Sequence, residues 1–156
     1  MDDPNSNIAF LLHDVARLLR QRFEQNSRAL QLTRSQCQVL AYLARREGIQ
    51  QGELAALLEI EPITLTRLVD RLEQGRLVER RSHPRDRRVR LLYLTAEARP
   101  LIGDIFAVGA ATRAEALEQV SEEDRALLFD ILGRMKTNLL RKLDAERTGE
   151  RKASHG

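Results

Sequence analysis

Two short helical segments, separated by only three residues, constrain the fold of this chain more than any other feature. Residues 51–58 and 62–74 both repeat apolar side chains every three or four positions, and Pro62 suits the first turn of the second segment. The short connection, 59–61, requires the two helices to cross at a steep angle. Ala55 places a small side chain where they approach. The pattern therefore predicts a helix-turn-helix, although Glu59 occupies the turn position where glycine is usual.

Amphipathic helices are expected before this motif. Apolar residues recur at helical spacing from Ile8 to Phe23, and Thr33 is suited to cap a second helix that Gly48 closes. A chain of 156 residues with 42% hydrophobic content can bury one good core. We therefore expect a single domain over residues 1–144.

After Gly75 the spacing of apolar residues changes from a helical to a strand pattern. Residues 77–81 and 89–94 alternate branched and aromatic side chains around a turn at 82–84, which predicts a β-hairpin. Thr95 is suited to cap a long helix, which Pro100 should weaken or bend, and Ser121 begins a last helix. The predicted fold class is mainly α with a small β-hairpin wing: a winged helix-turn-helix lobe over 33–95 plus a helical dimerisation region.

The first and last helical regions, 8–30 and 96–144, are too long and too apolar for a small lobe to cover. We expect them to pack against a second copy of the chain, since two-fold homodimers are the commonest oligomers. Residues 145–156 are polar, charged and without apolar periodicity, which predicts a disordered tail.

The second helix of the motif exposes groove-reading side chains. Thr64, Arg67 and Arg71 form one stripe, with Thr66 and Asp70 beside it. Arginine pairs bidentately with guanine, and threonine can bond a base or phosphate or touch a thymine methyl group. An ordinary amphipathic surface helix would show the same pattern, so this helix alone leaves both interpretations open.

The hairpin favours the nucleic-acid interpretation. Residues 76–90 carry seven arginines against two acidic residues, Glu79 and Asp86. Such a density costs stability through self-repulsion, whereas arginine is strongly favoured inside a narrow DNA minor groove. A merely solvated hairpin is the alternative. The arginines are Arg76, Arg80, Arg81, Arg85, Arg87, Arg88 and Arg90.

Residues 32–94 resemble the MarR family of winged-helix regulators. The matching segments are LTRSQ at 32–36, QGELA at 51–55, TLTRLVDRLE at 64–73, GRLVER at 75–80, DRR at 86–88 and LYLT at 92–95. The pattern around the second and fourth helices is similar to the SlyA-type branch. The resemblance implies a homodimer built from the first, fifth and sixth helices, with recognition helices in successive major grooves and wing tips in the flanking minor grooves of an inverted-repeat operator.

The resemblance also implies which residues contact DNA. Thr64, Thr66 and Arg67 are the base-reading candidates, and Arg87 is the minor-groove residue at a wing tip held by Asp86 and Arg88. Family wings often begin with Asp-Pro, but His83-Pro84 stands there in this chain, so a salt bridge from that aspartate to the tip is absent. The remaining expected DNA contacts are Ser35, Gln51, Arg71, Arg85 and Arg88 itself.

Relatives in this family often bind small aromatic acids in a cleft between the dimer helices and the lobe. In this chain His13, Arg17 and Arg20, together with Phe23, can line such a cleft for an aromatic carboxylate effector. The alternative, which we favour, is that they only solvate the first helix or form salt bridges.

Other classes of protein find little support. The single cysteine, Cys37, excludes an internal disulfide, and its mid-helix position favours an inert buried thiol over a redox sensor. His13, His83 and His155 have no metal-ligand spacing, so we expect neither metal nor cofactor. We find no signal peptide, membrane span or catalytic motif, and expect a cytoplasmic protein that is not an enzyme.

We therefore predict a sequence-specific regulator of transcription that binds double-stranded DNA as a homodimer. Repression is favoured over activation, with release by a small anionic aromatic ligand as a possible control. The alternative is a dimeric helical protein-interaction module that has lost DNA binding.

Overall fold

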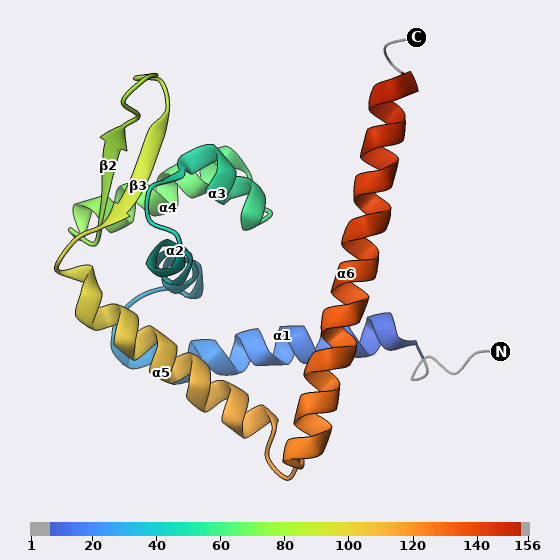
Figure 1. The fold of residues 1–156 in the computed structure, drawn as a ribbon. Coiled ribbons are helices and arrows are strands. Elements are labelled where there is room, and N and C mark those ends of the chain that lie inside the picture. The colour runs from blue at the N-terminus through green and yellow to red at the C-terminus, as the bar shows by residue number, and fades with distance from the viewer. Residues whose placement is uncertain (1–6, 154–156) are drawn as a thin grey trace. The chain divides into compact units, whose positions relative to one another are not determined.

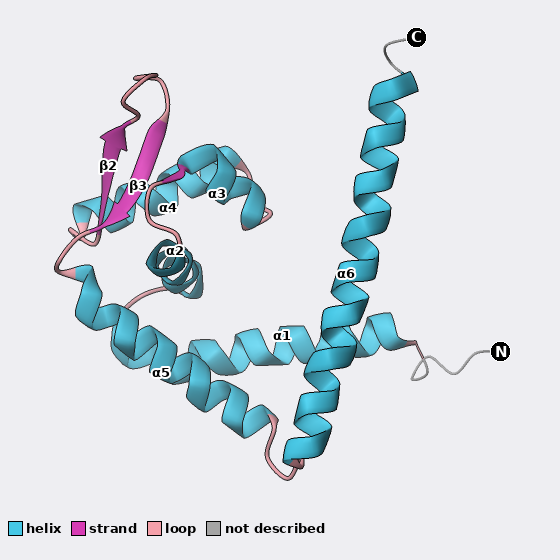
Figure 2. Ribbon diagram, in the orientation of Figure 1, coloured by secondary structure: helices cyan, strands magenta, loops and turns pink. Residues whose placement is uncertain are grey.

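The computed structural model describes residues 7–153, in two compact units that divide between Ala116 and Leu117 (Figure 1). The elements of the first unit are α1 (Ile8–Asn26), a short 3-10 helix η2 (Arg28–Leu30), α2 (Arg34–Arg45), β1 (Ile49–Gln50), α3 (Gln51–Leu57), α4 (Pro62–Gln74), β2 (Val78–Ser82), β3 (Arg90–Leu94) and α5 (Ala98–Ala116). The second unit contains α6 (Glu122–Ala153). The predicted fold class is confirmed, because helices dominate and the strands form one small sheet (Figure 2). The single domain over residues 1–144 stays a prediction.

Helices α3 and α4 form the predicted helix-turn-helix. Ala55 is buried, and its carbonyl accepts a hydrogen bond from Ile60 N (3.1 Å), which closes the turn. Glu59 has φ 53°, the left-handed conformation that glycine usually supplies at this point. The turn therefore keeps its geometry without glycine.

The sheet has three antiparallel strands in the order β1-β3-β2. Strand β2 pairs with β3 so that Val78 lies opposite Leu94 and Arg80 opposite Leu92, which confirms the hairpin. The two-residue β1 was not predicted, because so short a strand has no alternating pattern. Gly48, expected to close α2, lies in the turn directly before β1, whereas α2 already ends at Arg45. The φ of Gly48 is 76°, its N–H donates to Leu92 O (2.8 Å), and a Cβ there would lie 2.9 Å from the Tyr93 hydroxyl.

One hydrophobic core lies beneath the sheet and between the helices of the lobe. Helix α2 supplies four of its side chains, while α5 contributes Ala98 and Ile105. Helix α1 contributes no fully buried residue. The core members are Cys37, Val39, Leu40, Leu43, Ile49, Leu54, Ala55, Leu65, Val69, Leu72, Val78, Leu92, Leu94, Ala98 and Ile105.

The predicted capping residues are in place, although some helix ends differ. Thr33 and Gln36 form a reciprocal capping box on α2, and Thr95 Oγ1 accepts from Ala98 N (3.3 Å) at α5. Helix α5 ends at Ala116, whereas the helix expected after Thr95 was predicted to continue to about Val120. Because it begins at Ala98, Pro100 is its third residue, where a missing N–H costs no intrahelical bond.

Helix α6 begins behind Ser121, whose Oγ accepts from Asp124 N (3.1 Å), as predicted. The helix extends to Ala153 and so includes residues 145–153, for which the sequence predicted disorder. This segment is rich in Ala, Glu, Arg and Lys, which favour helix even without an apolar face, and an existing helix extends more easily than a new one starts. Residues 154–156 of the predicted tail lie outside the described residues. Between residues 7 and 153, no helix is long and apolar enough to cross a membrane.

Candidate nucleic-acid interface

Helix α4 presents one buried side and one polar exposed side. Leu65, Val69 and Leu72 are buried in the core, whereas Arg67 and Arg71 are exposed. Neither guanidinium has a hydrogen-bond or ion-pair partner within the described part of the chain. Both arginines are therefore free to contact an external anion.

Thr64 lies at the edge of α4 that faces α2. It lines a hollow together with Ser35, near the start of α2, and Arg20 from α1. The structure thus brings together two of the predicted DNA-binding residues, Ser35 and Thr64. Two helix starts meet here, and such N-termini favour phosphate groups.

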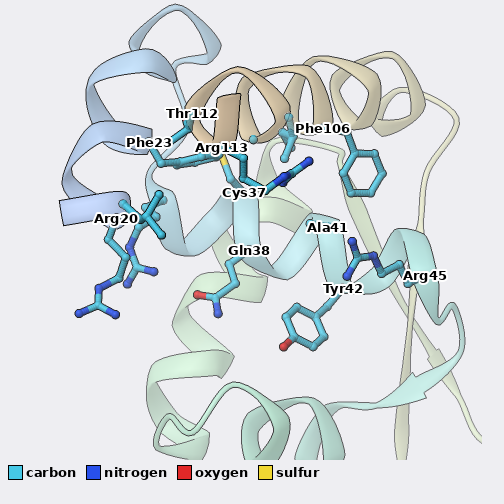
Figure 3. A pocket seen from close by; sticks show the side chains of 14 residues that line it. Arg20, Phe23, Cys37, Gln38, Ala41, Tyr42, Arg45, Phe106, Thr112 and Arg113 are labelled. Carbon is cyan, nitrogen blue, oxygen red and sulfur yellow. The ribbon is translucent and has the colours of Figure 1, made fainter. Parts of the chain in front are cut away.

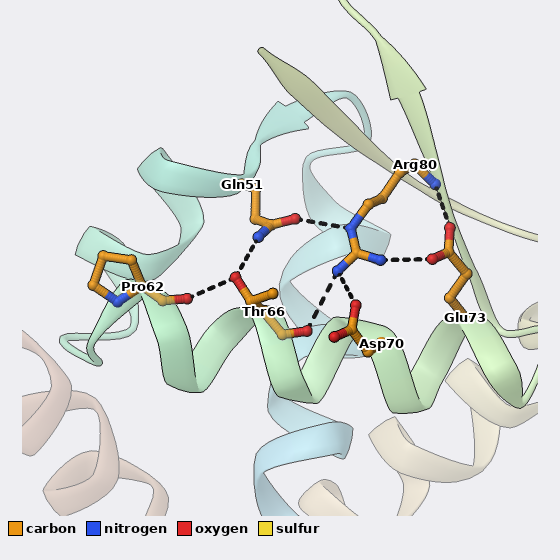
Figure 4. Close-up of polar contacts among 6 residues, drawn as sticks. All are labelled: Gln51, Pro62, Thr66, Asp70, Glu73 and Arg80. Atoms are coloured by element: carbon orange, nitrogen blue, oxygen red, sulfur yellow. Dashed lines mark hydrogen bonds and ion pairs between the residues drawn. The ribbon is translucent and has the colours of Figure 1, made fainter. Parts of the chain in front are cut away.

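Thr66 and Gln51, both predicted to contact DNA, bond to each other in the structure (Figure 4). Gln51 Nε2 donates to Thr66 Oγ1 (2.9 Å), and the Thr66 hydroxyl donates to Pro62 O (2.9 Å), one turn back in the helix. The Thr66 proton is consequently used within the protein.

Arg80 of β2 joins the wing to both helices of the motif. Its Nε donates to Gln51 Oε1 (3.0 Å), and its Nη2 donates to Thr66 O (3.3 Å). Nη2 also pairs with Asp70 (2.6 Å) and Nη1 with Glu73 (2.6 Å), while Glu73 accepts the Arg80 backbone N–H as well (3.2 Å). Only 17% of the Arg80 side chain is exposed. We call Gln51, Thr66, Asp70, Glu73 and Arg80 the frame, because these residues fix the base of the wing on α4.

Sequence reasoning missed the role of Arg80, which it counted with the other cations of the hairpin. The signal was the period of two along the strand, since Arg80 lies two residues after the buried Val78 and so shares its face. Acidic residues on the neighbouring helix, Asp70 and Glu73, were the available partners.

The arginines of the hairpin divide into partnered and free groups. Arg81 pairs with Glu79 and lies 4.2 Å from the centre of the Tyr93 ring, and Arg90 Nη1 donates to Ser82 Oγ (2.7 Å). Arg85 and Arg87, in the loop between the strands, are exposed, and their guanidinium groups have no partner among the described residues. Arg76, just before β2, is likewise exposed without a side-chain partner in the described part of the chain, so the tip carries two of the free charges of the hairpin.

Hydrogen bonds accepted by two side chains, Asp86 and His83, hold the tip in shape. Asp86 Oδ1 accepts from the backbone N–H of Arg88 (3.0 Å) and from its Nε (3.4 Å), in agreement with the holding role expected for this pair. His83 Nδ1 accepts from Arg85 N (3.2 Å), two residues on, as an aspartate does in an Asx-turn. The imidazole thus replaces the missing Asp-Pro aspartate as a turn acceptor.

A separate pocket lies among α1, α2 and α5, with a volume of about 340 Å³ (Figure 3). Of the predicted ligand residues, Arg20 lines this pocket. His13 does not line it, and neither does Arg17, which pairs with Asp14 (3.4 Å). Sequence reasoning missed most of the walls. The lining residues are Leu19, Arg20, Phe23, Arg34, Cys37, Gln38, Ala41, Tyr42, Arg45, Ile105, Phe106, Gly109, Thr112 and Arg113.

Cys37 forms part of this pocket wall but is almost fully buried. Burial raises the pKa of the Cys37 thiol, since the thiolate loses its solvation. The raised pKa lowers the thiolate fraction at neutral pH and agrees with the expectation of an inert thiol.

A charged pair joins helix α1 to helix α5. Arg22 of α1 makes a two-fold contact to Glu115 of α5 through Nε (2.5 Å) and Nη2 (3.1 Å). The Arg22 hydrogen bond holds the pKa of the Glu115 carboxyl below its usual value. Asn26 donates to Thr112 Oγ1 (3.1 Å) beside this pair. These bonds connect the carboxyl-terminal ends of α1 and α5.

Comparisons with known proteins agree with this geometry. Residues 30–89 match the model described as "MarR family". An uncharacterised HTH-type transcriptional regulator, YdgJ of Bacillus subtilis (strain 168), is 30% identical over 134 residues, covering 86% of this chain and 80% of the relative.

Solved structures show the same fold. A crystal structure of MarR has a TM-score of 0.80 at 26% identity and covers 90% of this chain and 96% of its own. A putative MarR family transcriptional regulator from Listeria monocytogenes, crystallised with a 26mer DNA, has a TM-score of 0.76 at 25% identity. That match covers 89% of this chain and 90% of the Listeria chain.

Proposed function

The chain belongs to the MarR family of transcriptional regulators, and from this premise we propose that it binds an inverted-repeat operator as a homodimer and represses transcription. The observation that carries the proposal is the placement of free arginines on the lobe. Arg67 and Arg71 project from α4, and Arg85 and Arg87 from the wing tip, whereas the strand arginines Arg80, Arg81 and Arg90 have partners. The frame holds both projecting groups on one rigid support. The SlyA-type branch stays a prediction.

Each group suits one groove of B-form DNA. A recognition helix enters the major groove, where arginine reads guanine, and an arginine at a narrow minor groove gains from its negative potential. We assign base reading to Arg67 and Thr64, minor-groove insertion to Arg87, and phosphate contact to Ser35, Arg71, Arg85 and Arg88. Gln51 and Thr66 act by positioning α4.

Homodimerisation accounts for apolar surface that the lobe leaves uncovered. On α1, Ile8, Leu11, Val15 and Leu18 recur at spacings of three and four, and all are exposed, Leu11 by 60%. Helix α6 also exposes apolar side chains, including Phe129, Leu139 and Leu143. We propose that both faces are buried against a second copy. A dimer that binds two half-sites in successive major grooves needs its recognition helices about 34 Å apart, one turn of DNA.

RNA polymerase cannot bind operator DNA that the dimer already covers, so DNA binding by the dimer would repress transcription. We propose that the protein acts in the cytoplasm. We propose that a small aromatic carboxylate in the α1–α2–α5 pocket releases the DNA. The pocket walls hold aromatic and aliphatic side chains with four arginines (Arg20, Arg34, Arg45 and Arg113) and no acidic residue. Such a wall suits an amphipathic anion.

DNA binding is tested by fluorescence anisotropy on duplexes from around the protein's own gene, across a salt series. The native protein should bind one duplex far more tightly than a scrambled one, with affinity falling by about 0.9 log units per log unit of salt for each phosphate neutralised. Arg67→Ala should abolish the preference. Arg28→Ala, which removes an exposed charge on η2, should keep it. A flat salt dependence without preference would favour the protein-interaction module.

The dimer is tested by light scattering on the full chain. Leu11→Glu places a charge in the centre of the exposed α1 stripe and should convert dimer to monomer. Ala9→Glu, on the same exposed helix but outside the 8–11–15–18 stripe, is the matched control and should remain dimeric. A monomeric native protein would overturn this part of the proposal.

The effector role is tested with benzoate and 2-hydroxybenzoate as probes. Either probe should lower operator affinity of the native protein. Arg113→Ala removes a pocket arginine that does not line the hollow of Ser35 and Thr64, so it should remove that response while operator affinity without probe is unchanged. An equal response in native and variant protein would exclude the pocket as the site of action.

A further inference from the structure

The outward side of α4 contains an apolar residue that the charge pattern does not reveal. With 100° of rotation per residue, the direction opposite the buried Leu65, Val69 and Leu72 is occupied by Ile63, Arg67 and, as the last residue of the helix, Gln74. Arg71 and Thr64 lie to one side of this direction, and Thr66 and Asp70 to the other. Ile63 and Arg67 are therefore the side chains in the first two turns of α4 that point most directly into a groove that receives this helix.

Ile63 is 59% exposed, although it stands next to the well-packed turn of the motif. A single exposed apolar side chain is ordinary on a protein surface. The position of Ile63 is more informative than its exposure. It lies in the first turn of α4, one turn before Arg67, and the first residues of a recognition helix are those that contact base edges.

The frame removes the polar competitors on the same face. The Thr66 hydroxyl donates to Pro62 O and accepts from Gln51, and Asp70 is bound to Arg80 at 2.6 Å. The Thr66 side chain is thus directed toward α3, and the Asp70 side chain toward the wing. Over the first two turns of α4, the free chemistry along the centre of the outward face is one alkyl group followed by one guanidinium.

We propose that Ile63 is a specificity-determining residue that packs against the 5-methyl group of a thymine in each operator half-site. This inference rests on the proposed function, in which α4 lies in the major groove. The thymine methyl is the one apolar group that a base pair presents there. Four residues of helix rise about 6 Å and one base pair rises about 3.4 Å, so this thymine lies one or two base pairs from the guanine bound by Arg67.

The experiment replaces thymine by deoxyuridine, which removes only the methyl group. A duplex of highest affinity is first selected by the native protein from a random-sequence pool, and each thymine of both half-sites is then replaced in turn. The native protein should lose about three- to fivefold in affinity at one symmetric thymine position, as expected for one buried methyl group. Ile63→Ala should bind more weakly and show no loss at that position.

Two further variants keep the result specific. Ile63→Val retains a branched side chain and should retain part of the uracil penalty. Leu57→Ala removes an exposed apolar side chain from α3, where Leu57 is 45% exposed, and should show the full native penalty. Alanine suits a helix, so Ile63→Ala should melt at the native temperature.

The outcomes separate this inference from the function beneath it. A native protein that binds the selected duplex but tolerates uracil at every position overturns the role of Ile63 and leaves DNA binding intact. An Ile63→Ala variant with the native uracil penalty also overturns it, because another side chain would then contact the methyl group. Failure to select any duplex overturns both.

Discussion

The base and the tip of the wing both carry arginines, but Arg80 at the base and Arg87 at the tip have opposite surroundings. At the base, Arg80 is 17% exposed and donates to Gln51, Thr66, Asp70 and Glu73. At the tip, Arg87 is exposed and has no partner within the described residues. A buried guanidinium is tolerated only when it is paired, and here pairing makes it a structural link. An unpaired, solvated one is available to a ligand. The position of each arginine in the hairpin therefore indicates its function better than the number of arginines does.

Arg80→Met should have the largest effect. It leaves Gln51 Oε1 and Asp70 without the Arg80 donor and Glu73 with only the backbone N–H of residue 80, which should lower the free energy of unfolding by about 1–3 kcal/mol. Operator affinity should also fall, because the wing and α4 are no longer fixed to each other. Urea unfolding and fluorescence anisotropy measure the two effects.

Arg80→Lys is the matched control for the base. Lysine keeps the charge but offers no planar fork, so partial recovery of stability and affinity is expected. If Arg80→Met leaves unfolding unchanged while DNA affinity falls, Arg80 belongs with the tip residues, and the contrast between base and tip is wrong.

Arg87→Ala should act in the opposite sense, on binding alone. Operator affinity should fall, and the salt slope should decrease by about 0.9 for each phosphate that the side chain no longer neutralises. The free energy of unfolding should stay at the native value. Arg28→Ala, with the same change in charge, should alter neither quantity. A loss of stability in Arg87→Ala would show that the tip is structural too.

Thr66→Val should produce a smaller change that distinguishes framing from base reading. Valine keeps the branched shape but removes the hydroxyl, so unfolding should become easier by about 0.5–1.5 kcal/mol. The base preference selected from a random pool should be unchanged, and Thr66→Ser should behave as the native protein. A changed base preference at native stability would return Thr66 to the DNA-reading residues.

His83→Ala should have the smallest effect, confined to the tip. Loss of the acceptor for Arg85 N loosens the turn, so operator affinity should fall by no more than about threefold, in line with one exposed hydrogen bond. His83→Asn retains a neutral acceptor and should stay close to native. Equal losses in the two variants would mean that the imidazole itself contacts DNA.

Much of the fold could be predicted because its signals are local. Pro62 at a helix start, Thr33 before Gln36, and the change of period after Gly75 each depend on a few neighbouring residues, and all three agree with the structure. Strand β1 and the helix beyond residue 145 could not be predicted in this way. The first exists only through its pairing with Leu92, and the second through extension of a helix begun more than twenty residues earlier.

The candidate site was predictable in composition more than in arrangement. Arg67 was predicted from the exposed stripe of its helix and Arg87 from the family resemblance, and both are exposed in the structure. Whether a given polar residue is free, however, depends on partners that lie far along the chain. Gln51 meets Arg80 across 29 positions, and this contact changes what Gln51 is available to do. Likewise, the pocket takes Leu19, Arg20 and Phe23 from α1 but not His13 or Arg17, which lie earlier on that helix.

The separation of the frame from the outward face of α4 has an evolutionary consequence. Arg67 and Arg71 make no hydrogen bond or ion pair in the described part of the chain, and Ile63 is largely exposed, so substitutions there leave every contact of the frame intact. Descendants of this protein can therefore acquire new operators through changes at these few positions. A substitution in the frame, by contrast, removes hydrogen bonds from several residues at once. We therefore expect the frame residues to change slowly among descendants.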